Sequence, residues 1–111
     1  MSNLFRELIP DEFQILGHTV KIQRVDSIDS PEGITHLGYS DYQVCLLSIR
    51  NSDDELELCE SCIEQTYLHE VVHFILGAMG EDKLNDNEKF VDTFAGLLHQ
   101  ILKTSITRED T

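Results

Sequence analysis

Two histidines four residues apart, with a glutamate directly after the first, form the segment of this chain best suited to chemistry. They stand in the sequence His69-Glu70-Val71-Val72-His73. Positions i and i+4 are neighbours on an α-helix, so both imidazoles can bind one divalent ion. The carboxylate between them can then take a proton from water activated by the metal, which is the general-base arrangement of metallopeptidases. The pattern therefore predicts metal-dependent hydrolysis.

A catalytic zinc ion usually takes three protein ligands and keeps one position for water, so two histidines leave this site one ligand short. Apolar spacing predicts a second helix over about residues 86–103, with Asn85 or Asp86 as its N-cap. A short glycine-containing loop would bring the first turn of this helix near the end of the first helix. The candidates for the third ligand are Glu81, Asp82, Asp86, Glu88, Asp92 and His99.

Glu88 is the preferred third ligand, because it lies in the first turn of the predicted second helix. Asp92 lies one turn later on the same face and is either the second choice of ligand or a group that orients a histidine. A structural interpretation competes with the ligand role, since Glu88 follows Asn85 by three residues and can complete a capping box with it. The preferred site is thus one Zn²⁺ per chain on His69, His73 and Glu88, although such a ligand set also accepts iron, manganese or cobalt.

Three further residues are weaker candidates for the site. Thr66 precedes His69 by three residues and shares its helical face, so it can contact the groups that orient the ligands. His36 and Tyr39 lie in a predicted strand, and either can reach the site to stabilise a developing oxyanion. The competing interpretation is that a lone histidine or tyrosine on a strand is a packing residue.

These residues resemble the pattern of a known family of zinc peptidases. The motif at 69–73, followed by EKFVDTFA at 88–95, is similar to the ImmA/IrrE type, in which a glutamate opens a short stretch ending in Phe-Ala. Over about residues 9–103 the chain resembles the small metallopeptidases encoded by bacterial phages and prophages. Weaker points of similarity are Ile9-Pro10, the segment 17–20 and Leu37-Gly38-Tyr39.

The resemblance implies a minimal zincin-like metallopeptidase in the cytoplasm of a bacterial host cell. Its implied zinc ligands are His69, His73 and Glu88, and its implied general base is Glu70. The implied substrate is a protein or peptide.

The elements that must position these residues begin with strands. Apolar and polar residues alternate on both sides of a Gly17-His18 turn, which predicts a hairpin. Two more strands are expected, separated by a turn at Ser40-Asp41, after an exposed loop over residues 26–33. The four predicted strands are 13–16, 19–25, 34–39 and 43–49.

Helices are expected over about residues 55–77 and 86–103, the first with acidic residues in its opening turn and a stop at Gly77 or Gly80. Strands and helices together predict an α+β fold, with a small twisted antiparallel sheet of three to four strands packed on two main helices. Strand 43–49 is the expected edge nearest the metal, where an extended substrate could add to the sheet.

Composition limits the class of protein. At 111 residues and 41% hydrophobic, the chain is expected to form a single metallopeptidase-like domain over residues 1–111. No apolar run approaches the roughly 20 residues needed to cross a bilayer, and the first ten residues do not resemble a signal peptide. We therefore expect a cytoplasmic protein that does not bind membranes.

Eight basic and 21 acidic side chains give a net charge of −13, which makes direct binding to nucleic acid improbable. Three functions remain. The preferred one is a zinc-dependent endopeptidase acting on an intracellular protein, because metal binding alone would not need Glu70. The alternatives are a non-catalytic zinc-stabilised domain that binds a protein, and an acidic mimic of nucleic acid that inhibits a basic partner.

Cysteines occur at Cys45, Cys59 and Cys62, and the odd number without an export signal indicates reduced thiols. Residues 59–62 spell C-x-x-C, but they lack a second ligand pair and fall within the predicted helix. Cys62 precedes His69 by two turns, about 10 Å along a helix axis, too far to share an ion. The pair is therefore interpreted as ordinary helix residues, one buried and one partly exposed.

Overall fold

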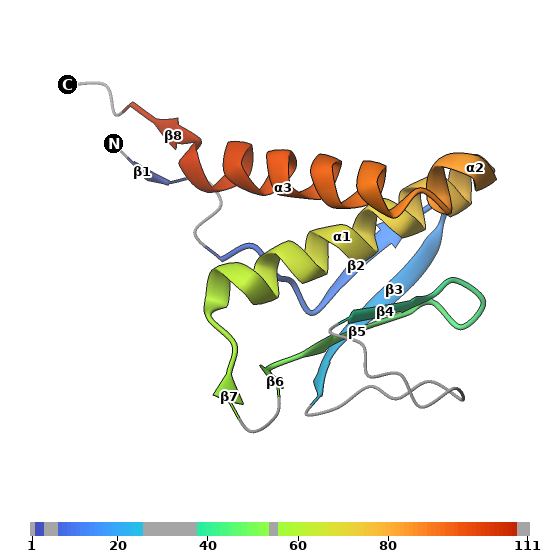
Figure 1. The fold of residues 1–111 in the computed structure, drawn as a ribbon, viewed down its shortest axis with the longest axis horizontal. Helices are drawn as coiled ribbons and strands as arrows, with labels where there is room; N and C mark the ends of the chain where they lie inside the picture. Colours follow the sequence, from blue (N-terminus) through green and yellow to red (C-terminus); the bar gives the residue numbers. More distant parts are fainter. Residues whose placement is uncertain (1, 4–6, 26–37, 54–55, 109–111) are drawn as a thin grey trace.

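A four-stranded sheet packs against two main helices in the computed structural model, which describes residues 2–3, 7–25, 38–53 and 56–108 (Figure 1). This arrangement confirms the predicted α+β fold. The expected loop over 26–33 and the first part of the expected strand at 34–39 lie outside the described residues.

The sheet is mixed rather than wholly antiparallel. Its strands are β2 (Glu12–Ile15), β3 (His18–Val25), β4 (Gly38–Asp41) and β5 (Leu46–Arg50), in the order β2-β3-β5-β4. The pairs β2/β3 and β4/β5 are antiparallel, whereas β3 and β5 are parallel. Strand β5 follows β4 through a hairpin turn, so it runs antiparallel to β4. It lies between β4 and β3, and in this direction it runs parallel to β3.

The insertion of β5 also corrects the predicted edge strand. Segment 43–49 was expected at the edge, but β5 lies between β3 and β4, and Leu47 and Ile49 are fully buried. The edge strand beside the first long helix is β4. Among the described strands, the edge of the sheet on this side is therefore β4 and not segment 43–49.

Both hairpin turns are displaced from the predicted positions by local chemistry. Leu16 and Gly17 have positive φ, as a two-residue turn with the twist of the flanking strands requires, so His18 already belongs to β3. In the second hairpin, Asp41 Oδ1 accepts hydrogen bonds from the backbone N–H groups of Gln43 and Val44. The expected turn at Ser40-Asp41 is therefore wrong, because Asp41 ends β4 and stabilises the turn after it.

The first long helix, α1 (Glu60–Met79), starts later than the residue 55 expected from apolar spacing. Two short strands, β6 (Ser52–Asp53) and β7 (Leu56–Glu57), pair with each other before it. The helix runs two residues beyond the expected end at 77 and stops at Gly80, the later of the two predicted stops, whose φ of 73° is left-handed and whose N–H bonds to carbonyls of the last turn.

The second long helix, α3 (Glu88–Thr104), follows the short helix α2 (Asp82–Asn85). Its N-cap is Asn87, whose side-chain oxygen accepts from the Phe90 N–H at 3.0 Å. The expected cap at Asn85 or Asp86 is therefore wrong, and so is the capping box between Asn85 and Glu88. The Asn85 side chain is left available for another contact.

Helix α1 forms the middle layer, with the sheet on one side and α3 on the other (Figure 1). Its buried side chains consequently face both neighbours, and Phe74 is 1% exposed against Phe13 and Tyr42. Beyond α3, β8 (Ile106–Thr107) pairs with β1 (Ser2–Asn3). None of the helices in the described ranges is long and apolar enough to span a membrane.

Candidate metal centre

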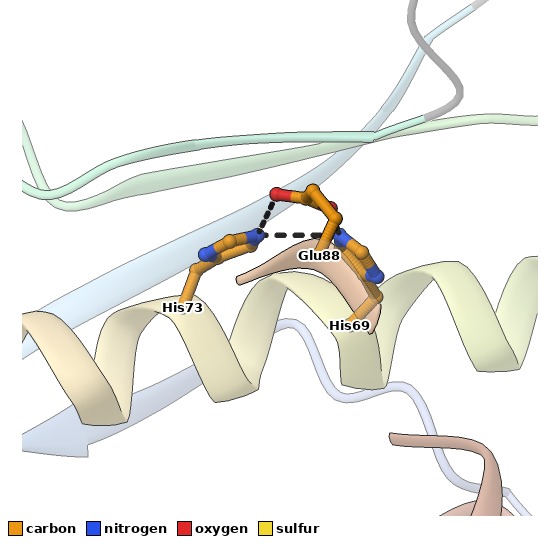
Figure 2. Close-up of side chains that lie close together, drawn as sticks. All are labelled: His69, His73 and Glu88. Carbon is orange, nitrogen blue, oxygen red and sulfur yellow. Dashed lines mark hydrogen bonds and ion pairs between the residues drawn. The ribbon is translucent and has the colours of Figure 1, made fainter. Parts of the chain in front are cut away.

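Three side chains from two helices converge on one point between α1 and α3 (Figure 2). His69 and His73 come from α1, and Glu88 is the first residue of α3. The two Nε2 atoms are 3.2 Å apart, and the nearest carboxylate oxygens lie 3.2 Å from Nε2 of His69 and 3.3 Å from Nε2 of His73. This His/His/Glu group can hold a metal ion.

The size of this triangle suits zinc. Bonds of about 2.0–2.1 Å at tetrahedral angles place two ligand atoms of a zinc ion about 3.3 Å apart. The two Nε2 atoms are 3.2 Å apart, close to that value, and a different Glu88 oxygen lies near each of them, Oε2 at 3.2 Å from His69 and Oε1 at 3.3 Å from His73. Two imidazoles and one carboxylate are also a ligand set that catalytic zinc sites use, with the fourth position left for water.

Each histidine is held through its other ring nitrogen. The Nδ1 of His69 lies 2.6 Å from Asp92 Oδ1, and the Nδ1 of His73 lies 2.5 Å from Asn85 Oδ1. Carboxylate and amide oxygens only accept, so each Nδ1 donates and each Nε2 is left for the centre. Two Nε2 atoms and the Glu88 carboxylate therefore face one another, an arrangement that a bound cation would stabilise.

Glu70 lies beside the triangle without belonging to it. Its Oε2 is 4.0 Å from Nε2 of His69, and the residue is 7% exposed. Burial raises the pKa of the Glu70 carboxyl above its ordinary value, against the opposing effects of the two imidazoles and of a hydrogen bond with Ser40. A carboxylate so close to the ligands can exchange a proton with water at an ion bound there.

Strand β4 comes close enough to reach Glu70 because residue 38 is a glycine. A Cβ at Gly38 would lie 2.6 Å from Thr66 Cγ2 and 3.0 Å from Glu70 Cγ. A larger residue would push β4, and Ser40 with it, away from α1. The Thr66 hydroxyl donates to the Cys62 carbonyl at 3.0 Å, so Thr66 packs its methyl against β4 and shows no bond to a ligand.

An open cleft of about 790 Å³ exposes the group to solvent. Strand β4 and the turn after it form one wall, with Tyr39 and Tyr42, and helices α1 and α3 form the other. Tyr39 is 49% exposed in this wall, and its expected role at an oxyanion stays a prediction. His36, the other candidate for that role, lies outside the described residues.

The other candidate third ligands are not part of the group. Asp92 bonds to a candidate ligand instead of joining it, which is the orienting contact considered for it. His99 is buried on α3, where its Nε2 lies 2.9 Å from Glu64 Oε1, and Lys103 donates to the other oxygen of Glu64 at 3.0 Å. The remaining candidates outside the group are Glu81, Asp82 and Asp86.

Two contacts at the centre could not be predicted from the sequence. Asn85 was assigned to a helix cap, and only the position of α2 beside His73 gives its side chain a different partner. Ser40 was assigned to a turn, and its contact with Glu70 depends on β4 packing against α1. Neither contact has a signal in residue spacing, because both join segments distant in the chain.

Comparisons with protein-family models, with curated proteins and with solved structures give no match to this chain. The geometry of the centre therefore supplies the argument for function.

Proposed function

We propose that this protein is a zinc-dependent peptidase that hydrolyses peptide bonds of a protein substrate. The observation that carries the proposal is the convergence of His69, His73 and Glu88, whose ligand atoms lie within 4.8 Å of one another, with the buried carboxylate of Glu70 next to them. A domain that only binds metal has no need to bury Glu70 there, since burying a carboxylate costs free energy.

The roles of the side chains follow from their positions. A zinc ion bound by the triangle would polarise the peptide carbonyl and lower the pKa of water towards 7. Asp92 and Asn85 hold the two imidazoles so that both Nε2 atoms face the ion site. Glu70 accepts the proton of the attacking water and passes it to the leaving amine. Ser40 keeps the Glu70 carboxylate turned towards the cleft.

The edge strand β4 provides a place for the substrate backbone. It lines the cleft through Gly38, Tyr39 and Ser40, and its side away from β5 has no strand partner among the described residues. An extended peptide could pair with this edge by backbone hydrogen bonds and reach the centre with its scissile carbonyl. Such binding requires little of the substrate side chains, so an unfolded protein is a suitable probe.

The test is proteolysis of fluorescently labelled, unfolded casein by the zinc-loaded full-length protein. Glu70→Gln removes the proton acceptor but keeps the shape of the side chain, and we expect the rate to fall by about 10² to 10⁴-fold. Glu81→Gln is the matched control, because it neutralises an exposed carboxylate outside the group and should cleave like the wild type. Zinc-loaded wild type that leaves casein and a random peptide library intact would refute the peptidase and leave a metal-binding domain.

A further inference from the structure

Two cysteines lie together at the start of α1, away from the metal centre. Cys59 is the N-cap of the helix, Cys62 lies in its first turn, and their Sγ atoms are 2.7 Å apart. Both residues are exposed, so the expectation that one is buried is wrong. The cause is the late start of α1, which places the C-x-x-C segment at the N-terminus of the helix instead of in its interior.

The environment makes the two sulfurs unequal. The N-terminus of a helix carries partial positive charge and favours a thiolate. Hydrogen bonding with the Cys62 thiol and then with Ser61 lowers the pKa of Cys59 to about 7, whereas the same contact with Cys59 raises the pKa of Cys62. Cys59 is thus suited to attack a disulfide, and Cys62 stands in contact with it to complete an exchange.

We propose that Cys59 and Cys62 form a redox-active dithiol that exchanges with low-molecular-weight disulfides of the oxidised glutathione class. The Cys59 thiolate attacks one sulfur of the disulfide, forms a mixed disulfide and releases one thiolate. Cys62 then loses its proton and attacks the Cys59 sulfur, which releases the second thiolate. One disulfide is reduced to two thiols, and two protein thiols are oxidised to one disulfide.

The contact between the sulfurs makes the second step favourable. A disulfide needs its two sulfurs brought to bonding distance without movement of the backbone, and residues 59 and 62 already hold theirs in contact. Both side chains are exposed, so a small disulfide can reach them.

This dithiol is separate from the proposed peptidase chemistry. Cys62 precedes His69 by seven residues, about 10 Å along the helix axis, so it cannot bind the same ion. Cys62, but not Cys59, is among the residues that line the cleft. Cys45, in the turn between β4 and β5, contacts the Tyr42 carbonyl and serves as an internal control.

The test is incubation of the reduced full-length protein with oxidised glutathione at pH 7, followed by mass spectrometry of intact protein and of peptides. We expect the wild type to lose two hydrogen atoms, to form a Cys59–Cys62 disulfide and to keep no glutathione. Cys62→Ser should trap one glutathione on Cys59. Cys45→Ser should behave like the wild type. Circular dichroism should show all three proteins folded.

The rate of the first step gives a second measurement. At pH 7 a thiol with a pKa of about 7 is about half ionised, whereas a thiol with the ordinary pKa of 9.0 is about 1% ionised. The thiolate of lower pKa is, however, a weaker nucleophile, which reduces this roughly fiftyfold advantage in thiolate concentration by about tenfold. Cys62→Ala removes the side-chain contact with Cys59, whereas a serine hydroxyl could replace it, so the pKa of Cys59 should rise towards the ordinary value in Cys62→Ala. We therefore expect wild-type Cys59 to react with oxidised glutathione up to about fivefold faster than Cys59 in Cys62→Ala.

Two results would overturn the proposal. One is stable glutathione on Cys59 of the wild type, which would show that Cys62 does not complete the exchange. The other is protection of both cysteines from iodoacetamide by added zinc in the Glu88→Ala variant, which would make the pair a metal site. A failure of the peptidase assay affects neither reading, because this experiment measures only the thiols.

Discussion

Helices α1 and α3 are joined by two clusters of histidine and carboxylate side chains, and the clusters differ in what balances their charge. In the first, Glu64 of α1 accepts from His99 and Lys103 of α3, so the protein supplies its own cation. In the second, His69 and His73 of α1 meet Glu88 of α3 in the open cleft. Its two histidines donate outward from Nδ1, and no Lys or Arg is among the described residues that line the cleft.

The same residue types therefore join two helices in one place and form a candidate metal site in another. The Glu64 cluster is complete without a ligand and holds the two helices together. The candidate metal centre instead brings two imidazole nitrogens and a carboxylate together at one point in an open cleft, and this group can hold a metal ion. Its fixed histidines and accessible cleft are therefore interpreted as a site prepared for a metal rather than as a second link between helices.

Breaking the Glu64 cluster should have the largest effect on stability. Glu64→Ala leaves the buried His99 and the Lys103 ammonium without their carboxylate, and we expect a loss of about 2–3 kcal/mol in the free energy of unfolding, measured by urea denaturation. Glu60→Ala removes an exposed partner of Arg24 from the same helix and should cost less than about 1 kcal/mol. Equal losses in the two variants would contradict the structural role of Glu64.

Removing the contact that orients one histidine of the candidate metal centre should have a smaller effect, and it should lower zinc affinity rather than stability. Asp92→Asn replaces the carboxylate that orients His69 with a neutral amide, and we expect zinc affinity to fall about 10–100-fold in competition with a chromophoric chelator. Asp86→Asn is the matched control and should bind zinc like the wild type. Unchanged affinity in Asp92→Asn would mean that the contact with His69 does not tune the site.

The smallest expected effect is the change with pH in the stability that Glu64 contributes. Hydrogen bonds and charge from His99 and Lys103 outweigh burial and lower the pKa of Glu64 below 4.5. A lowered pKa in the folded state stabilises the protein above the ordinary carboxyl pKa, and that stabilisation is lost as pH falls through the folded-state value. The difference in unfolding free energy between wild type and Glu64→Gln should therefore shrink from pH 7 to about pH 3. A difference that grows towards acid would reverse the sign of this argument.

The layer arrangement could be predicted from the sequence, but the order of the strands could not. Alternating apolar residues indicate strands wherever they lie, and Leu47 and Ile49 suit a central strand as well as an edge. The start of α1 was placed too early because apolar spacing continues through residues 56–59, where the chain forms β7 and a short connection instead. Pairing between β6 and β7 outweighed helix propensity there.

The candidate site also has a part that could be predicted from the sequence and a part that could not. His69 and His73 are four residues apart, so helix geometry alone brings them together, and Glu88 follows from a second helix that returns along the first. Asn85, Ser40 and Gly38 act across elements, through contacts that only the packing of α2 and β4 against α1 creates. Spacing along the chain carries no information about such contacts.

The most direct test of the central claim is the zinc content of the purified, reconstituted protein, measured by elemental analysis on wild type, Glu88→Ala and Glu70→Gln. We predict about one zinc ion per chain in the wild type and in Glu70→Gln, and none in Glu88→Ala, because Glu88 completes the triangle and Glu70 stands outside it. A wild type that takes up no zinc, or a Glu88→Ala variant that keeps it, would contradict the metal centre.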